Sequence, residues 1–414
     1  MKVLLINNCH FRRGGADVVY LNTGMLLEEY GHDVAYFSTN SVHNIHSGYS
    51  GYFVDDVDAL QLGFLKQLLN MPRKLYSVQA AKNLERLLKD FKPDIAHIHL
   101  YKGGLTASIL PVLRKFRIPV ALTLHDYSLL CPRNIFVDGD GNLCERCLFG
   151  TTFNCVIHRC NRKNIFYSTV NYIEYIINNV FFKPEKYFDK IICVCKFNLE
   201  KHLTRPKIRE RLVLLYNFFY DQKGIVPLHE KGDYYLFYGR LKSIKGVVTL
   251  IDAWERLSDK NLKLKIAGDG NLFNYLENRL KNRNITNIEL LGHKTGDELE
   301  QLIKNSSFVI VPSECYENNP MTIIEGYSFG KPVIATHLGG IPELIEEGKT
   351  GFSFEMRNIE GLKNLIEFTS RLSDDEYRTM SLNARQFVEE YYAKEVHYEK
   401  LLNIYKETVA GYEK

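Results

Sequence analysis

The chain has 414 residues, of which 45% are hydrophobic and 25% charged, a composition typical of a soluble globular protein. Its length exceeds what one hydrophobic core usually organises, so two domains are expected. The net charge of +4 is unevenly divided: residues 1–220 carry 28 Lys and Arg against 19 Asp and Glu, a balance of +9, and the remainder carries 25 against 30, a balance of −5. A basic first half suggests an anionic partner, either a membrane surface or a phosphate-bearing substrate, and no nucleic-acid motif accompanies it.

The chain opens on an apolar strand at residues 2–6, followed by a polar loop and a helix over about residues 16–30. The strand turns polar too soon for a signal peptide, and no run of eighteen apolar residues follows, so we expect a cytoplasmic protein without a transmembrane helix. Gly14 and Gly15 lie just before the helix, where glycine lets backbone amides approach a ligand and the helix end favours an anion. A glycine pair also serves turn geometry alone, and the third glycine of a dinucleotide fingerprint is missing.

The α/β alternation continues up to residue 127. The predicted elements are a helix over residues 60–90 broken near Pro72, a strand over 93–99, a helix over 103–115 and a strand over 119–123. His125 follows the last of these strands and is a candidate functional residue, because functional groups of open α/β sheets lie at the carboxyl ends of strands. We interpret His99 as facing this edge and His97 as packed, and a metal-binding pair is the alternative.

Residues 131–160 interrupt the alternation and contain five of the nine cysteines. Cys144 and Cys147 have the two-residue gap of a metal knuckle, and Cys155 and Cys160 follow. Four thiolates grouped in this way suit tetrahedral zinc, and because four sulfur ligands leave no open position, such a zinc ion would be structural. Buried free thiols in an irregular loop are the alternative, and the sequence leaves both open.

Residues 162–190 mix aromatic side chains with lysine and arginine. A helix of this composition suits either a membrane interface or the domain core, and both interpretations stay open. Strands are predicted at 190–195 and 213–216, and the stretch from Asn217 onward is predicted to be a linker. We therefore place the first domain at residues 1–220, with the cysteine-rich insertion at 131–160.

A regular run of βα units from residue 234 to residue 311 predicts a parallel sheet in the second half. Arg240 ends its first strand, and Lys245 precedes the helix that follows. A diphosphate requires the planar guanidinium of an arginine, an ammonium and free amides at a helix N-terminus. We therefore interpret this pair as a phosphate site rather than as two surface cations. Later loops at the same edge contain Gly268, Gly292 and His293.

The stretch 312–345 contains two carboxylates, Glu317 and Glu325, eight residues apart. Pro320 suits the start of a helix, which predicts Glu317 in a loop and Glu325 in the first turns of that helix. Two acids in an α/β crevice suit a hydroxyl-rich ligand, and two solvated surface glutamates are the alternative. The second domain is placed at 221–390, and an amphipathic C-terminal helix at 391–414.

Together these motifs resemble the retaining nucleotide-sugar glycosyltransferases of family 4. The resemblance is strongest over 234–355 and weaker over 1–37 and 119–127. The residues that carry it are Gly14-Gly15-Ala16, His125, Gly239-Arg240 with Lys245-Gly246, Gly268-Asp269-Gly270, Pro312-Ser313 through Glu317 to Glu325, Gly330-Lys331-Pro332-Val333 and Gly339-Gly340. The glutamate pair with the flanking GKPV is specific, whereas the first glycine pair is not.

The resemblance implies an α/β GT-B fold, in which two Rossmann-like domains with parallel sheets face each other across a cleft. The second domain would bind most of the donor and the first the acceptor, and the C-terminal helix would cross back to the first domain. Arg240 and Lys245 would hold the donor diphosphate. Glu325 would bind the ribose hydroxyls, and Glu317 would lie by the transferred sugar.

The resemblance also implies roles for the remaining candidate site residues. The loop at Gly292 and His293 would meet the base through its backbone, Gly15 would approach the phosphates, and His125 would contact the sugar. Because Arg240, Lys245 and helix N-termini can stabilise a leaving diphosphate, no cofactor or catalytic metal is expected besides the nucleotide-sugar donor.

The implied function is retaining transfer of a sugar to a glycan or lipid-linked acceptor in cell-surface polysaccharide synthesis, at the inner face of the cytoplasmic membrane. Three other functions stay open. One is a nucleotide-sugar epimerase of the same fold, and another is a non-catalytic subunit of a polysaccharide assembly complex. The third is a phosphorylase, for which the pyridoxal-phosphate lysine site is not found.

Overall fold

The computed structural model describes residues 1–55, 72–221, 225 and 227–412, in two compact units. The first unit comprises Met1–Tyr216 together with the C-terminal segment that begins at Lys394, and the second comprises Asn217–Ala393. Part of the helix predicted over 60–90 lies outside the described residues. Among the described residues, no helix is long and apolar enough to cross a membrane.

The first unit is built on a six-stranded parallel sheet with the order β2-β1-β3-β4-β5-β6. Its strands are β1 (Lys2–Asn7), β2 (Asp33–Phe37), β3 (Ile95–Leu100), β4 (Val120–Leu124), β5 (Lys190–Cys193) and β6 (Leu212–Leu214). The chain runs from β1 to β2 and then crosses to β3 on the other side of β1, so the order reverses between β1 and β3. Ligands of open parallel sheets bind beyond the carboxyl ends of the strands at such a reversal.

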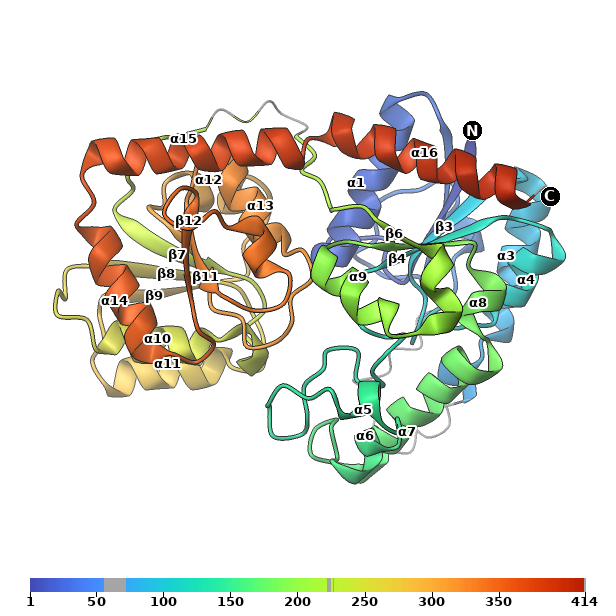
Figure 1. Ribbon diagram of the computed structural model, residues 1–414, viewed down its shortest axis with the longest axis horizontal. Helices are drawn as coiled ribbons and strands as arrows, with labels where there is room; N and C mark the ends of the chain where they lie inside the picture. The colour runs from blue at the N-terminus through green and yellow to red at the C-terminus, as the bar shows by residue number, and fades with distance from the viewer. Residues whose placement is uncertain (56–71, 222–224, 226, 413–414) are drawn as a thin grey trace. The chain divides into compact units, whose positions relative to one another are not determined.

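Helices cover both faces of this first sheet, as Figure 1 shows. They include α1 (Gly15–Glu29) and α16 (Lys394–Tyr412) on one face and α3 (Val78–Phe91) and α4 (Ile109–Lys115) on the other. The alternation of side chains along a strand explains the two cores. Leu5 of β1 packs in one core with Leu401 of α16, whereas Ile6 packs in the other with Leu84 of α3. The C-terminal helix thus completes the core of the first unit.

The connection from β4 to β5 contains the cysteine-rich segment and several helices. These are α5 (Arg146–Phe149), α6 (Asn154–Ile157), α7 (Ile165–Ile176), a π-helical segment Ile177–Phe181 and α8 (Pro184–Tyr187). Helix α9 (Lys196–Leu203) follows β5. The side chain of Asn164 caps α7 by accepting from the backbone amides of Phe166 and Tyr167. The expected interruption of the α/β alternation is therefore confirmed.

The helix predicted over 103–115 begins only at Ile109. Gly103 and Thr106 have φ values of +86° and +65°, and the amide of Thr106 donates to the carbonyl of Tyr101 over 2.6 Å. A left-handed backbone at these positions cannot continue a right-handed helix. The predicted start was therefore wrong, because residues 101–108 form turns.

The second unit contains a parallel sheet with the order β12-β11-β10-β7-β8-β9. Its strands are β7 (Tyr234–Tyr238), β8 (Lys263–Ala267), β9 (Ile288–Gly292), β10 (Val309–Val311), β11 (Val333–Thr336) and β12 (Gly351–Phe354). Numbered from one within the unit, this is the strand order 3-2-1-4-5-6 of dinucleotide-binding domains. The order reverses between β7 and β10, which is where a ligand is expected.

Two layers of helices cover the second sheet (Figure 1). One layer contains α10 (Val247–Glu255), α11 (Phe273–Asn282) and α14 (Ile359–Ser370), and the other contains α12 (Gly296–Lys304), α13 (Met321–Ser328) and α15 (Asp374–Tyr391). Tyr235 and Phe237 of β7 pack with Trp254 of α10 in the core. The predicted parallel sheet is confirmed.

Candidate functional site

The loop after β7 is held against the loop after β10 by a glycine. Lys245 ends a short 3-10 turn, and Gly246 follows with φ +70°. A Cβ on Gly246 would lie 1.7 Å from the carbonyl oxygen of Pro312. Only glycine combines this close approach with a left-handed backbone. The sequence Lys245-Gly246 therefore brings the ammonium of Lys245 to the strand end beyond β10.

Lys245 contacts the first of the two predicted acids directly. Its Nζ lies 2.5 Å from Oε1 of Glu317, and the hydroxyl of Ser313 donates to the same oxygen over 2.8 Å. The side chains of Lys245 and Glu317 are 24% and 15% exposed. The two loops that flank the strand reversal are thus joined by a largely buried ion pair.

The ion pair determines the charge state of both groups. Burial alone would raise the pKa of Glu317, but Lys245 and the hydrogen bond from Ser313 outweigh it and lower the pKa below the usual 4.5. Burial opposes the charge of Lys245 as well, yet Glu317 raises its pKa above the usual 10.5. Exposed Arg240 adds a positive potential at both groups. At neutral pH the site therefore holds two cations and an ionised carboxylate.

The predicted Gly339-Gly340 pair holds the backbone of Glu317. A Cβ on Gly339, where φ is +64°, would lie 2.6 Å from the carbonyl oxygen of Glu317. The amide of Gly340 donates to that same oxygen over 2.7 Å. Gly339 and Gly340 therefore fix the backbone position of Glu317 in the preceding loop.

Glu325 lies on α13, which begins after Pro320 as predicted. Its Oε2 lies 3.1 Å from the hydroxyl oxygen of Tyr238, and that hydroxyl is also 2.9 Å from the carbonyl of Thr322. Tyr238 is the last residue of β7. Glu325 is therefore attached to the same strand whose following loop contains Arg240, and Tyr238 is a site residue that the sequence did not single out.

The glycines at the ends of β7, β8 and β9 form a closely packed row. The amide of Gly268 donates to the carbonyl of Gly292 over 2.7 Å, and a Cβ on Gly268 would lie 1.9 Å from the carbonyl oxygen of Gly239. Gly292 has open space around its Cβ position, and His293 beside it is exposed. Packing therefore requires Gly268, whereas the Gly292 loop is accessible to a ligand.

The loop after β10 contains a second acid, Glu314, which holds this loop in place. Glu314 is buried, accepts from the hydroxyl of Thr249 over 2.6 Å and pairs with Nε of Arg357 over 2.6 Å. Its amide donates to the carbonyl of Ile244, the residue before Lys245. Glu314 was missed in the sequence because its partners are distant in the chain.

In the first unit, Gly14 and Gly15 form the N-terminus of α1 at the reversal between β1 and β3. Gly14 is the N-cap and provides no side-chain cap, and its carbonyl accepts from the amide of Val18 over 3.0 Å. A Cβ on Gly14 would approach only Asp17, at 3.9 Å. No side chain caps this helix end, and the nearest side chain to Gly14 is the buried acid Asp17 in the first turn.

His125 follows β4 and is half-buried, and it lies beside the buried histidines His97 and His99 of β3. Its Nε2 lies 2.9 Å from Nδ1 of His99, and the rings stack. His97 lies between the hydroxyl groups of Tyr405 and Thr123, each 2.7 Å away. Burial lowers the pKa of His125 to about 4, so its ring is neutral at neutral pH. The interpretation of His97 as packed is confirmed.

The structure gives no support to zinc binding by the four cysteines, which was one of the two interpretations that the sequence left open. Within the described ranges, no three His, Cys, Asp or Glu side chains are grouped as metal ligands. Cys144 lies 3.6 Å from the guanidinium of Arg146, and the thiols of Cys147 and Cys155 donate to the carbonyls of Thr152 and Ser168. Cys160 lies within hydrogen-bonding range of Cys155, and both are free thiols. The spacing of the cysteines did not reveal these contacts.

The two units have the α/β architecture of the GT-B fold, and the second has cations and acids at its strand reversal. Over residues 13–222 the sequence matches the family described as Glycosyltransferase Family 4, and over 220–387 the family described as Glycosyl transferases group 1. The first match spans more than half of the 414 residues, so the chain belongs to glycosyltransferase family 4.

Relatives agree with this membership, and a solved structure shares the fold. An uncharacterised glycosyltransferase of Methanocaldococcus jannaschii is 36% identical over 206 residues, which is 49% of this chain and only 55% of that relative. The N-acetyl-alpha-D-glucosaminyl L-malate synthase of Bacillus anthracis is 22% identical over 398 residues, 95% of this chain and 94% of the relative. The structure of Anabaena HepE in complex with UDP-glucose superposes with a TM-score of 0.64 at 16% identity, over 99% of this chain and 100% of that one.

Proposed function

We propose that this protein is a retaining glycosyltransferase that moves a sugar from a nucleotide-diphosphate sugar to a glycan or lipid-linked acceptor. The observation that carries the proposal is the contact of Lys245 with Glu317, beside Arg240, at the strand reversal of the second unit. A diphosphate needs two or more cationic donors, and a sugar needs hydrogen-bonding oxygens within reach of them. This strand edge supplies both.

In the proposed reaction, Arg240 and Lys245 bind the diphosphate of the donor. The bond from the anomeric carbon to the phosphate oxygen breaks, and negative charge develops on the leaving diphosphate. The acceptor hydroxyl forms the new bond on the same face of the sugar and gives its proton to the departing phosphate oxygen. Preorganised cations stabilise the developing charge without a proton donor from the protein.

The charge states fit these roles. The lowered pKa of Glu317 keeps it a carboxylate, so it accepts hydrogen bonds from the transferred sugar and does not act as a general acid. The raised pKa of Lys245 keeps its ammonium charged. Glu325 would accept from the ribose hydroxyls, and the loop at Gly292 and His293 would receive the base. In the first unit, Gly15 would approach the phosphates and His125 the sugar.

HepE was solved with UDP-glucose, so a UDP-sugar is the first donor to test. The decisive measurement is the melting temperature of the purified chain with UDP-, GDP-, ADP- and CMP-sugars in turn, because a bound donor stabilises the folded state. We expect one base to raise the melting temperature. A panel with no shift for any donor would overturn the proposal, and donor turnover with inversion at the anomeric carbon, followed by NMR, would overturn retention.

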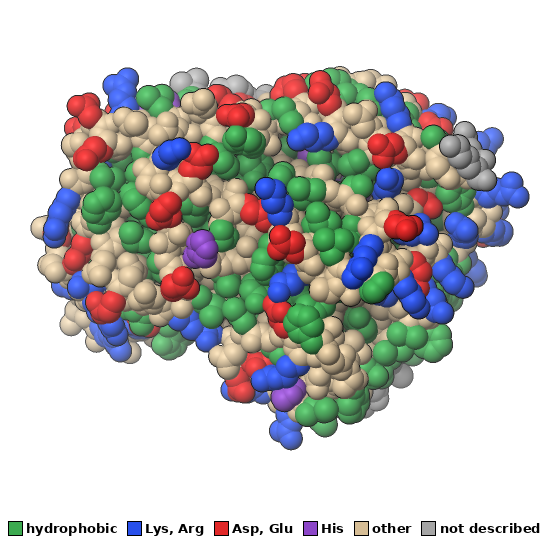
Figure 2. Space-filling view, in the orientation of Figure 1, with side chains coloured by type: hydrophobic (Ala, Val, Ile, Leu, Met, Phe, Trp, Pro, Cys, Tyr) green, Lys and Arg blue, Asp and Glu red, His purple; other side chains and the backbone are tan. Residues whose placement is uncertain are grey.

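We also propose that the protein acts at the inner, cytoplasmic face of a membrane during polysaccharide or glycoconjugate synthesis. Large apolar side chains are exposed on the segment α5–α7, among them Phe149 at 77%, Ile157 at 58% and Ile165 at 58%. Figure 2 shows hydrophobic and basic side chains together on this segment. Such a mixture suits the interface of an anionic bilayer. Cosedimentation with anionic vesicles that is lost at high salt is the expected result, and no binding at low salt would contradict it.

A further inference from the structure

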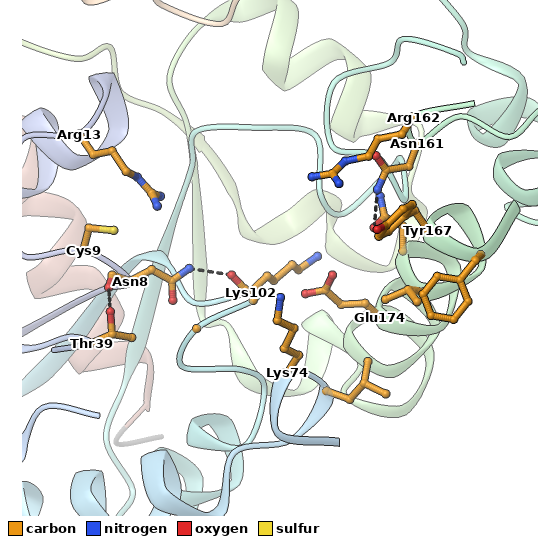
Figure 3. A pocket seen from close by; sticks show the side chains of 16 residues that line it. Asn8, Cys9, Arg13, Thr39, Lys74, Lys102, Asn161, Arg162, Tyr167 and Glu174 are labelled. Carbon is orange, nitrogen blue, oxygen red and sulfur yellow. Dashed lines mark hydrogen bonds between the residues drawn. The ribbon is translucent and has the colours of Figure 1, made fainter. Parts of the chain in front are cut away.

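A cavity of about 320 Å³ lies inside the first unit, at the reversal between β1 and β3. Figure 3 shows that charged side chains from separate parts of the chain point into it. Arg13 comes from the loop after β1 and Lys102 from the residues after β3, whereas Arg162 precedes α7 and Glu174 lies on α7. Lys74 enters from the helical turn at 72–75. The end of the connection from β4 to β5 thus forms one wall of a cavity whose other wall is the strand edge.

The lining of this cavity is strongly basic. The lining residues include four cations, Arg13, Lys74, Lys102 and Arg162, and one carboxylate, Glu174, a formal charge of four minus one, or +3. Arg13 also pairs over 3.8 Å with buried Asp17, which lies outside the lining. Burial raises the pKa of Glu174 and lowers the pKa of Lys102 to about 8. The lowered pKa of Lys102 shows that the protein alone solvates this ammonium poorly, and an anion bound beside Lys102 would compensate its charge.

The donors of this cavity are positioned for a ligand. Nζ of Lys102 donates to the carbonyl of Ser128 over 2.7 Å, and an ammonium has three protons to donate. The guanidinium of Arg162 lies over the ring of Tyr167, 4.8 Å from its centroid. Figure 3 shows Arg13 and Arg162 reaching into the space from opposite sides. Because the guanidinium of Arg162 is already stacked, it loses little conformational entropy when it binds a ligand, and this favours binding of an anion.

The wall beside the cations is apolar. Leu75, Phe166 and Val170 line the same cavity as Arg162 and Lys74. A volume of this size is at the lower end of small-molecule sites, with room for a charged head group and the carbons attached to it. The cavity therefore combines a cationic end with a hydrophobic side, which free inorganic anions do not require.

We propose that this cavity binds a phosphate or diphosphate ester carried by the acceptor. This inference rests on the proposed transferase function and specifies its acceptor as a phosphorylated one. Several converging cations match a group with several negative oxygens better than a single carboxylate. The ester's carbon chain or sugar ring lies along Phe166 and Val170. The acceptor is a lipid-linked diphosphate or a soluble sugar phosphate, which share this chemistry.

The test measures anion binding by isothermal titration calorimetry on the full chain carrying Arg240→Ala and Lys245→Ala, so that the second unit contributes no phosphate site. The probes are farnesyl diphosphate, glucose 1-phosphate, inorganic diphosphate and malate. Arg162→Gln is compared with Lys163→Gln, which removes the same charge from the neighbouring residue. Their φ values are +56° and +53°, and Lys163 is 68% exposed and paired with Asp140.

We expect one phosphate ester to bind, about tenfold more weakly in Arg162→Gln and unchanged in Lys163→Gln. Glu174→Gln should bind more tightly, because it removes the opposing carboxylate. Preference for farnesyl diphosphate assigns a lipid-linked acceptor, and preference for glucose 1-phosphate a soluble one. Absence of binding, equal loss in the two neighbouring variants, or tighter binding of malate than of any phosphate ester would overturn the proposal.

The outcome is separable from that of the proposed transferase function. Donor binding is measured on the unaltered chain, and anion binding on the donor-site variant. If nucleotide sugars fail to bind but farnesyl diphosphate binds in an Arg162-dependent way, the transferase proposal falls and the anion site stands. If nucleotide sugars bind and no phosphate ester does, only the acceptor assignment falls.

Discussion

Nζ of Lys245 lies 2.5 Å from Oε1 of Glu317, across a separation of 72 residues. The contact joins the loops after β7 and β10, the strands between which the order reverses. A donor diphosphate that binds Lys245 must therefore share it with a carboxylate that the protein already provides. Several predictions about the site depend on this arrangement.

Removal of either cation should abolish sugar transfer while the fold persists. We expect Arg240→Ala and Lys245→Ala each to lower the transfer rate at least about 100-fold, because each removes a stabiliser of developing phosphate charge. Lys242→Ala is the control, since Lys242 is exposed in the same loop. Transfer rates and circular dichroism of the three variants check this. Near-native rates in the first two would rule out the phosphate assignment.

Gly246→Ala should destabilise the second unit far more than Gly292→Ala. Both residues have similar backbone conformations, with φ +70° and +68°, but a Cβ at Gly246 would lie 1.7 Å from the Pro312 carbonyl and one at Gly292 meets nothing within 4 Å. Conformational strain alone costs about 1–2 kcal/mol, which is the expected loss for Gly292→Ala. The Gly246 variant adds a clash with backbone. Urea unfolding of both variants measures the difference, and equal losses would contradict the close approach.

Glu317→Gln should show a loss of stability that depends on pH. The folded-state pKa of Glu317 lies below 4.5, so its contribution is present above that pH and is lost as the pH falls through the folded value. At pH 7 we expect a loss of about 2 kcal/mol, since a largely buried pair loses one partner. The melting curves of wild type and variant should converge at acid pH.

Glu360→Gln provides the comparison for that experiment. Glu360 also pairs with a cation, Arg256 at 2.8 Å, but both side chains are more than half exposed. Its effect on the melting temperature at pH 7 should be smaller than that of Glu317→Gln, because solvent screens an exposed pair. A larger effect at Glu360 would mean that burial does not decide the strength of these pairs.

Two tyrosines of α16 test the packing of the C-terminal helix. The hydroxyl of Tyr405 lies 2.7 Å from Nδ1 of buried His97, and that of Tyr398 lies 2.9 Å from Nε2 of partly buried His32. Tyr405→Phe leaves a buried ring nitrogen without this partner, so we expect a loss of about 1–3 kcal/mol, and less for Tyr398→Phe. Chemical denaturation compares the two, and the reverse order would contradict the burial of His97.

The second sheet was largely predictable from the sequence because its signals are local. Apolar runs end in glycine, as at Gly239 and Gly268, and helices follow at regular intervals, so a parallel sheet and its site edge follow from known βα rules. The positions of Arg240 and Glu325 at this edge follow in the same way. The contact between Lys245 and Glu317 could not be predicted in this way, because it depends on how two distant loops pack.

The insertion was the least predictable part. The spacing of Cys144 and Cys147 suggested a metal, but spacing does not specify where a thiol points. The basic cavity was also hidden, since Lys102 and Arg162 are sixty residues apart and meet only because α7 packs near the strand edge. Charge counts indicated an anionic partner for the first half, without indicating where it binds.

The place of α16 in the first unit has a consequence for synthesis of the protein. Leu401 and Tyr405 belong to the same core as Leu5, so this core is incomplete until almost the entire described chain has left the ribosome. The second unit, whose residues 217–393 are contiguous, can fold before it. The domain translated first is thus the last to be completed, and a nascent chain that stalls before residue 394 exposes the apolar surface that α16 would cover.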